Sequence, residues 1–316
     1  MSVQVYTGLE SVDPPLRGVT LTFGNFDGVH CGHQQILAQA GMLAERTGSP
    51  VVAVTFDPHP LKLIAPHRPM RCLTPLDEKI DRLGQAGADV VVVVQTTPAL
   101  LEQSPEQFVT DTVVPKFNPA HVVEGPSWRF GRGREGDVAL LQRLGDQHGF
   151  EVYAVPGWRL EIDASGPVLV TSTLIRDLLG RHHVHRAALC LGRPYGLVGR
   201  VIRGKGRGRA LGYPTANLET GDQVVPAEGV YAGWCRVGGC RRIAAVSIGR
   251  NPTFGQEPLS AEAFLLDFDE DIYDQRVRIE FLRWLRGQER FDSADALVRQ
   301  MHEDVQQVRE ICEAAI

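Results

Sequence analysis

The first half of the chain alternates short apolar runs with segments of helical period, and this alternation limits the folds open to it. The apolar runs cover residues 19–23, 51–56, 90–94, 121–123 and 152–155, and helical spacing covers 34–46, 77–87, 105–114 and 138–148. Continuous apolar runs are typical of strands buried on both faces, and parallel neighbours need a helical crossover between them. The pattern predicts an α/β doubly wound domain with a parallel sheet.

The pattern changes close to residue 189, where the helical period is lost. Short runs rich in Val, Ile and aromatic residues follow at 197–202, 229–237, 243–248, 261–268 and 277–281. Strands without intervening helices predict a small antiparallel β-barrel. Residues 292–315 return to helical spacing, with Asp292 or Ser293 as the N-cap. We therefore expect one domain at 1–186 and a second, a barrel ending in a helix, at 187–316.

Composition narrows the class of partner. The chain has 316 residues and a formal net charge of −5, which argues against bulk electrostatic binding to nucleic acid or to an anionic membrane. None of the six cysteines has CxxC spacing, and the first residues lack the apolar stretch of a signal peptide. The most apolar run, residues 90–94, is too short to cross a bilayer. We expect a cytoplasmic protein with no nucleic-acid or membrane partner.

A glycine-rich turn joins the first apolar run to the next helix. Residues 22–33 read Thr-Phe-Gly-Asn-Phe-Asp-Gly-Val-His-Cys-Gly-His, so two histidines stand three residues apart where the helix begins. Glycines let the backbone approach a ligand, and a helix N-terminus offers free N–H groups to phosphate. His30 and His33 share a face and can stabilise charge on a transferring phosphoryl group. The alternative is that they only cap the helix.

The string at 24–34 resembles the HxGH signature of nucleotidylyltransferases, in the form found in bacterial bifunctional riboflavin kinase/FMN adenylyltransferases. The resemblance implies that His30 and His33 are catalytic. It implies ATP binding by Gly24, Asn25 and Asp27.

Two further segments of the first half look like the same family. Thr-Phe-Asp-Pro-His-Pro at 55–60 matches its TFDPHP segment, and this match implies flavin binding by Asp57 and Pro58. Thr-Ser-Thr-Leu-Ile-Arg at 171–176 is similar to its SSTxIR segment, which faces the triphosphate. Two hydroxyls and a guanidinium at a helix start make a sensible phosphate clamp, although the segment taken alone reads as an N-cap and a solvated arginine. The implied ATP-binding residues are Ser172, Thr173 and Arg176.

One segment departs from the family. Where relatives commonly read GxNFxFG, residues 125–131 read Gly-Pro-Ser-Trp-Arg-Phe-Gly, so Ser127 replaces an Asn that helps to hold the nucleotide. A serine can donate one hydrogen bond but lacks the paired donor and acceptor of an amide. We keep Ser127 among the ATP-binding residues. The alternative to a bifunctional enzyme is a riboflavin kinase whose adenylyltransferase domain is weakened or lost.

A basic, glycine-rich stretch marks the second half. Eight Lys or Arg and no Asp or Glu lie between residues 181 and 209, and residues 203–209 read Arg-Gly-Lys-Gly-Arg-Gly-Arg. Such a stretch can wrap a polyphosphate, contact RNA or form a solvated loop. The first of these interpretations places ATP against Gly204, Lys205, Gly208 and Arg209.

The next residues favour the polyphosphate. Leu-Gly-Tyr-Pro-Thr-Ala-Asn-Leu at 211–218 resembles the LG-[FY]-PTAN motif of riboflavin kinases. Thr215 and Asn217 are two apart, so on extended backbone their oxygens lie on one side and can bind Mg²⁺ and phosphate. Thr215 is also an expected ATP contact. The resemblance further implies flavin contacts from Tyr213 and Asn251.

The same resemblance places the catalytic base of the kinase at Glu262. Phosphorylating an alcohol needs a group that receives the hydroxyl proton, and a carboxylate on a strand suits that duty. Without the surrounding motifs, Glu262 would read as the outward member of an alternating strand. Residue 274 is Asp where the family usually has Gly, which predicts a local change in turn geometry.

The resemblance spans roughly residues 15 to 310 and implies two reactions. ATP would phosphorylate riboflavin to FMN, and a second ATP would adenylylate FMN to FAD with release of pyrophosphate, with Mg²⁺ serving both. Two other classes stay open: a flavin or nucleotide sensor without turnover, and RNA binding through residues 181–209. The oligomeric state is left open as well.

Overall fold

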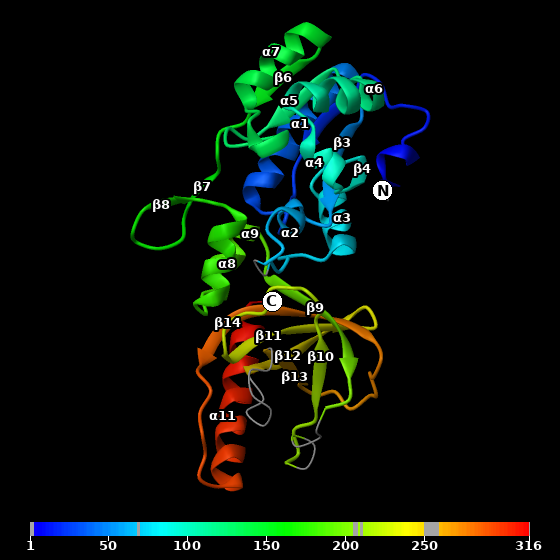
Figure 1. The fold of residues 1–316 in the computed structure, drawn as a ribbon. Helices are drawn as coiled ribbons and strands as arrows, with labels where there is room; N and C mark the ends of the chain where they lie inside the picture. The colour runs from blue at the N-terminus through cyan, green and yellow to red at the C-terminus, as the bar shows by residue number, and fades with distance from the viewer. Residues whose placement is uncertain (1–2, 68–69, 205–207, 209–210, 250–258, 316) are drawn as a thin grey trace. The chain divides into compact units, whose positions relative to one another are not determined.

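The computed structural model describes residues 3–67, 70–204, 208, 211–249 and 259–315 (Figure 1). Its contacts divide the chain into two compact units. The first comprises Met1–Met70, Pro75–Glu161 and Ser165–Val170, and the second comprises Arg71–Thr74, Ile162–Ala164 and Thr171–Ile316. Each unit has a sheet and a core of its own. The domain boundary expected between residues 186 and 187 stays a prediction.

A six-stranded parallel sheet forms the centre of the first unit. Its order is β1-β4-β3-β2-β5-β6, and every neighbouring pair is parallel. The strands are β1 (Gln4–Thr7), β2 (Thr20–Phe23), β3 (Val51–Asp57), β4 (Val90–Gln95), β5 (His121–Glu124) and β6 (Glu151–Ala154). The predicted parallel α/β sheet is confirmed. The edge strand β1 is an addition that the apolar pattern does not predict, because this strand is mostly exposed.

Helices cover both faces of this sheet. On one face, α1 (Cys31–Thr47) and α3 (Leu76–Gln85) bury leucines against the strands. On the other face, α7 (Val138–His148) packs with residues 105–117. That segment is not the continuous α-helix expected over 105–114, because a π-helical turn separates two short α-helical pieces. In order these are α5 (Pro105–Gln107), η2 (Phe108–Val113) and α6 (Val114–Phe117).

Shorter elements complete the first unit. They are η1 (Leu9–Ser11), α2 (Pro60–Ile64), α4 (Pro98–Glu102), η3 (Arg132–Arg134) and an antiparallel hairpin of β7 (Arg159–Glu161) and β8 (Pro167–Leu169). The strand order reverses beside β2, because the chain first builds β3 and β4 on one side and then returns to place β5 on the other. In open α/β sheets, ligands bind outside the carboxyl ends of the strands at such a point. Here the reversal point lies after Phe23 and Glu124.

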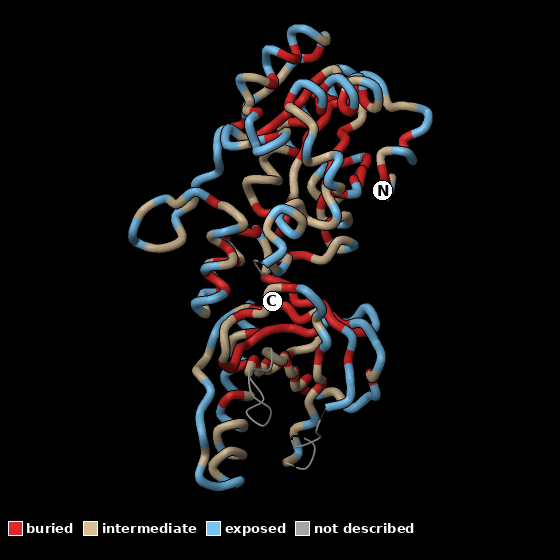
Figure 2. The backbone as a smooth tube through the Cα atoms, in the orientation of Figure 1, coloured by how far each residue is buried: buried red, intermediate tan, exposed pale blue. Residues whose placement is uncertain are grey.

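A closed antiparallel barrel forms the second unit, in the order β10-β13-β12-β11-β14-β9. The strands are β9 (Tyr195–Ile202), β10 (Thr215–Glu219), β11 (Gly229–Val237), β12 (Cys240–Gly249), β13 (Ser260–Leu265) and β14 (Arg276–Arg286). Inward and outward positions alternate along β10 and β13, and much of β11 is buried along its length (Figure 2). The predicted small antiparallel barrel is confirmed, with β10 as the strand that carries Thr215 and Asn217.

Among the described residues of this unit, the named helices are α8 (Ser172–Gly180), α9 (Val184–Leu191) and α11 (Ala294–Glu313). Ser293 caps α11, as expected, because its hydroxyl accepts a hydrogen bond from Ala296 N at 3.2 Å. Val308 and Cys312 bury the helix against the outside of the barrel. The predicted terminal helix is therefore confirmed. In the described ranges, no helix combines the length and the apolarity needed to cross a bilayer.

Candidate active sites

The loop between β2 and α1 is held in an unusual backbone conformation. Phe26, Gly28 and Val29 have φ angles of 46°, 88° and 39°. Positive φ suits glycine but is an outlier for a β-branched residue such as valine. Phe26 and Val29 are both 1% exposed, so apolar burial holds the loop in this shape. The loop turns the chain sharply from the end of β2 into the first turn of α1.

His30 and His33 meet where α1 begins. His30 is the N-cap residue, and its Nδ1 accepts a hydrogen bond from His33 N at 3.4 Å. The two imidazole rings stack with centroids 3.6 Å apart and an interplanar angle of 18°. Burial lowers the pKa of His33 well below its ordinary value, and the positive charges of His30 and Lys79 lower it further. His33 is therefore neutral without a ligand, and the positive end of the helix dipole remains available to attract a bound anion.

The buried side chain of Lys79 also holds the loop between β2 and α1 in place. The ammonium of Lys79, on α3, donates to the carbonyl oxygen of Asn25 at 3.2 Å and to Thr55 Oγ1 at 3.0 Å. Thr55 Oγ1 also donates to the Asn25 carbonyl at 3.3 Å. These hydrogen bonds attach the backbone of Asn25, which follows β2, to Thr55 of β3 and to Lys79 of α3.

Several buried polar atoms around this loop have no hydrogen-bond partner among the described residues. They are Thr22 Oγ1, Asn25 Oδ1, His33 Nδ1 and Gln35 Oε1. Buried polar atoms in a folded protein are normally paired, so a group of unpaired ones indicates a position that a ligand or water fills. Asn25 and His33 are among the residues predicted from the sequence, and Gly24 and the buried Asp27 lie on the same loop.

The neighbouring strand ends carry the other predicted residues of this unit. Asp57 is the last residue of β3, is followed by Pro58, and pairs with Gln95 of β4. Gln95 lines a cavity of about 310 Å³ at the carboxyl end of β4. Ser127 lies in the exposed loop after β5. The adjacent Trp128 packs on Phe23, with ring centroids 6.1 Å apart.

The phosphate clamp predicted from the sequence lies on α8. Thr171 caps this helix by accepting from Leu174 N at 3.1 Å, so Ser172 and Thr173 lie in its first turn. Arg176 Nε donates to the carbonyl oxygen of Arg71 at 3.3 Å. All three predicted residues belong to the second compact unit, and their role in binding ATP stays a prediction.

The second unit brings Thr215, Asn217 and Glu262 together on one face of the barrel. Asn217 lies directly opposite Glu262 in the pairing of β10 with β13. Thr215 Oγ1 donates to Glu262 Oε2 at 3.1 Å. Gly204 packs against the same group, because a methyl group on it would lie 2.2 Å from Asn217 Nδ2. The prediction that the oxygens of Thr215 and Asn217 share one side is consistent with this register.

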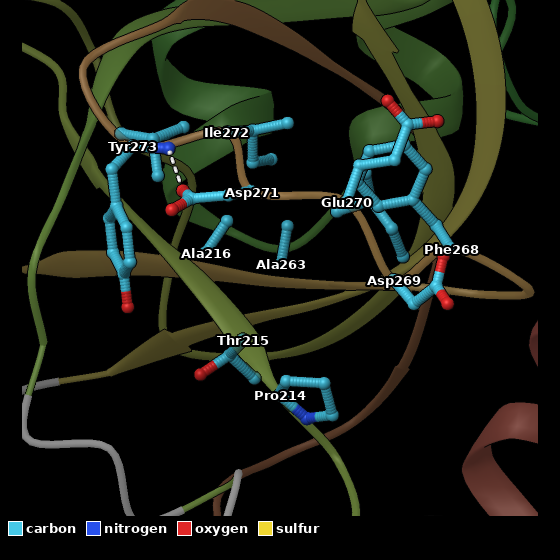
Figure 3. A pocket seen from close by; sticks show the side chains of 12 residues that line it. Pro214, Thr215, Ala216, Ala263, Phe268, Asp269, Glu270, Asp271, Ile272 and Tyr273 are labelled. Carbon is cyan, nitrogen blue, oxygen red and sulfur yellow. Dashed lines mark hydrogen bonds between the residues drawn. The ribbon is translucent and has the colours of Figure 1, made fainter.

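A cavity of about 330 Å³ opens beside Thr215 (Figure 3). Apolar side chains of the strands, among them Ala216 and Ala263, line its floor. Figure 3 shows Thr215 and Pro214 on one side and Asp271 and Tyr273 on the other, where Asp271 accepts from Tyr273 N at 3.0 Å. Thr215 thus borders the cavity and contacts the carboxylate of Glu262 at the same time.

Two further predicted positions of this unit can be placed. The Tyr213 ring lies edge-on to Phe264, with centroids 5.2 Å apart, on the strand that carries Glu262. Gly208 accepts from Tyr213 N at 2.8 Å through its carbonyl oxygen. Lys205, Arg209 and Asn251, which are also predicted contacts, lie outside the described residues.

Comparison with known proteins matches both units. A riboflavin kinase family model matches residues 191–312, and an FAD synthetase family model matches residues 13–165. The bifunctional riboflavin kinase/FMN adenylyltransferase of Escherichia coli (strain K12) is 34% identical over 297 residues, which cover 94% of this chain and 93% of that protein. This chain belongs to the bifunctional riboflavin kinase/FMN adenylyltransferase family.

Other relatives extend the match. The bifunctional riboflavin kinase/FMN adenylyltransferase of Listeria monocytogenes is 35% identical over 92% of this chain and 91% of that protein. The crystal structure of a macrolide-efflux protein from Streptococcus pneumoniae has a TM-score of 0.87 and 28% identity, and the match covers 98% of this chain and 99% of that chain. Family membership and the two enzyme domains confirm the predicted bifunctional riboflavin kinase and FMN adenylyltransferase. The roles of individual site residues stay predictions.

Within this family fold, two buried charged residues were not predicted, and the departure expected at residue 274 can be placed. Lys79 reads as an ordinary charged residue of a surface helix, yet it is 8% exposed and holds Asn25. Glu124 reads as the polar end of a strand, yet it is 1% exposed and accepts from Phe23 N at 2.6 Å. Asp274, where the family usually has glycine, has a φ of 62°, a conformation that favours glycine and that aspartate adopts more readily than most residues.

Proposed function

We propose that each unit performs one of the two reactions and that the predicted residues carry them. In the second unit, the γ-phosphoryl group of ATP passes to a ribityl hydroxyl of riboflavin and gives FMN and ADP. In the first unit, a phosphate oxygen of FMN attacks the α-phosphorus of ATP, the bond to the β,γ-diphosphate breaks, and FAD and pyrophosphate form. Riboflavin, FMN and ATP are the small-molecule partners.

The hydrogen bond from Thr215 to Glu262 is the observation that carries the kinase assignment. It orients the carboxylate of Glu262 towards Thr215, and Thr215 itself borders a cavity large enough to admit part of a nucleotide. With ATP in the cavity, its phosphates reach Thr215, and Glu262 receives the proton of the attacking hydroxyl as the new O–P bond forms. Tyr213 and Phe264 then offer an aromatic surface for the flavin on the same face as Glu262.

The donor set fits a magnesium ion. The hydroxyl of Thr215 and the amide oxygen of Asn217 are hard oxygen ligands, and no cluster of three His, Cys, Asp or Glu side chains occurs among the described residues. Magnesium commonly uses few protein ligands and completes its shell with substrate phosphates and water. Thr215 and Asn217 would hold Mg²⁺ together with ATP, and the ion would neutralise charge on the transferring phosphate.

The stacked histidines support the adenylyltransferase assignment. They stand at the N-terminus of α1, where backbone N–H groups attract phosphate, and the orphaned atoms of Asn25 and His33 offer further contacts. His30 and His33 stabilise charge that develops on the α-phosphate, and the loop from Gly24 to Asp27 holds the triphosphate. Asp57 and Pro58, at the carboxyl end of β3, hold the flavin of FMN. The phosphate clamp expected at Ser172, Thr173 and Arg176 belongs to the second unit and stays a prediction.

The cellular site follows from thiol chemistry. None of the six cysteines has the CxxC spacing of a redox pair, and proteins of this kind are typical of a reducing cytoplasm. We place the enzyme there.

One assay tests both reactions. Purified protein is incubated with riboflavin, ATP and Mg²⁺, and the flavins are separated by chromatography; a second incubation starts from FMN. We expect FMN and FAD in the first mixture and FAD in the second. Normal FMN formation with no FAD in either mixture would instead favour a kinase whose adenylyltransferase domain is inactive. Flavin binding without ATP consumption would indicate a sensor.

A further inference from the structure

The carboxyl group of Glu124 occupies a position that a strand hydrogen bond would otherwise fill. β2 and β5 pair through Thr20–His121 and Leu21–Val122, and the pairing ends there. On the other side of β2, pairing with β3 continues through Phe23 opposite Val54, and Gly24 N donates to Val54 O at 3.0 Å. β2 therefore stays attached to β3 but separates from β5 at its carboxyl end.

Successive N–H groups of a strand point to opposite neighbours. Because Gly24 N points to β3, Phe23 N points to β5, where no backbone carbonyl receives it. Glu124 Oε1 receives it instead, at 2.6 Å. Phe23 is 3% exposed and Glu124 is 1% exposed, so water is excluded from this contact. An N–H left without an acceptor in such a buried place would destabilise the fold.

This contact lies where two loops begin, one after β2 and one after β5. Phe23 is followed by the loop that ends in His30, and Glu124 is followed by the loop that contains Ser127. Trp128 adds a second attachment between these loops. Its ring packs on the ring of Phe23, and its backbone N–H donates to the carbonyl oxygen of Gly125 at 3.0 Å.

We propose that Glu124 is a positioning residue for adenylyl transfer: its side chain bridges the separated ends of β2 and β5 and fixes the spacing of the histidine loop and the loop of Ser127. The proposal rests on the adenylyltransferase function proposed above for this unit. Such a bridge fixes where the two loops begin and so the orientation in which they can hold a triphosphate.

The bridge needs an acceptor and does not need a negative charge. Burial raises the pKa of Glu124 well above its ordinary value, and the hydrogen bond from Phe23 N opposes this only in part. Glutamine has the same length and keeps a carbonyl oxygen for Phe23 N. Leucine fills a similar volume and offers no acceptor. The two substitutions therefore separate the hydrogen bond from packing.

The test compares E124Q, E124L and the control E151Q in the conversion of FMN to FAD. Glu151 is the first residue of β6, the strand beside β5. It lies at the amino ends of these strands, whereas Glu124 lies at their carboxyl ends, and it is exposed. We expect E124L to raise the KM for ATP and to lower kcat/KM about 100-fold, the scale expected for small misplacement of reacting groups. We expect kcat/KM of E124Q and E151Q to stay within about threefold of the wild-type value. E124Q keeps an acceptor for Phe23 N, and E151Q leaves the contact between Glu124 and Phe23 unchanged. Phosphorylation of riboflavin should be unchanged in all three.

Amide hydrogen exchange provides a second readout that does not depend on turnover. E124L should accelerate exchange at residues 23–27, and E124Q should leave it protected. Wild-type kcat/KM in E124L would overturn the proposal, and so would a loss in E124Q as large as that in E124L. If the wild-type protein makes no FAD, the function proposed for this unit is wrong, and exchange at residues 23–27 still decides whether Glu124 forms the bridge.

Discussion

The imidazole of His33 lies almost flat against that of His30, 3.6 Å from centroid to centroid, while its own backbone N–H donates to the His30 ring. Two imidazolium ions at this separation would repel each other strongly. The pair is therefore suited to one positive charge at most. A bound triphosphate would change that balance, because its negative charge favours protonated imidazole.

Replacing both histidines should separate the two activities. H30A/H33A should lower the conversion of FMN to FAD by at least about 10²-fold, because each lost donor at a developing charge costs about that much. Phosphorylation of riboflavin should be unchanged, since it occurs in the other unit. Rates are measured with FMN and with riboflavin as separate substrates. A double variant that is folded and has lost both activities would show that the division of labour is wrong.

The stability of the first unit should depend on the protonation of His33. The folded state holds the pKa of His33 below its ordinary value of 6.5, so the unfolded chain binds a proton first as pH falls. The stability of the wild type should therefore fall as pH drops below about 6.5 and level off below the folded pKa. H33Q removes this term. Urea unfolding between pH 8 and pH 5 should show wild type losing stability relative to H33Q; parallel curves would contradict the prediction.

Glu262 should matter to the kinase alone. E262Q keeps the size of the side chain and an oxygen for Thr215 but cannot accept the hydroxyl proton. We expect FMN formation to fall about 10²- to 10⁴-fold, the usual contribution of a general base. Conversion of supplied FMN to FAD should continue at the wild-type rate. E219Q, an exposed carboxylate on β10, is the matched control and should retain both activities.

Gly204 should tolerate no side chain. G204A would place a methyl group 2.2 Å from Asn217 Nδ2 and displace the amide from its position opposite Glu262. We expect a higher KM for ATP in the kinase reaction and little change in the adenylyltransferase reaction. The control is G287A, where a methyl group meets no atom within 4 Å. Equal kinetic effects of the two variants would rule out contact with Asn217 as the cause.

The apolar pattern predicted five of the six strands of the parallel sheet, five of the six strands of the barrel and the helix at the end, because a strand buried on both faces has a continuous apolar run such as 90–94. It did not predict β1, a mostly exposed edge strand without a continuous apolar run, or β10, in which buried Ala216 and Leu218 alternate with less buried residues. The π-helical turn at Phe108–Val113 was missed for another reason: its side chains keep a helical period, and only the backbone hydrogen bonds differ.

Some residues of the candidate sites could likewise be predicted from the sequence, and others could not. The histidines, Thr215, Asn217 and Glu262 stand in local strings, so a motif identifies them. Glu124 and Lys79 act through residues that are far away in sequence, 101 positions for Phe23 and 54 for Asn25. A buried charge in such a place looks like any surface charge until the tertiary contact is seen.

The positive φ angle of Val29 has a consequence for how this enzyme tolerates mutation. The loop keeps that conformation only while Phe26 and Val29 stay anchored in the cluster with Leu37, Leu43 and Leu83. A truncation of any of these leucines would release the loop toward a relaxed backbone and rotate the imidazoles away from their target. Catalytic efficiency is thus vulnerable at apolar positions that no substrate ever reaches.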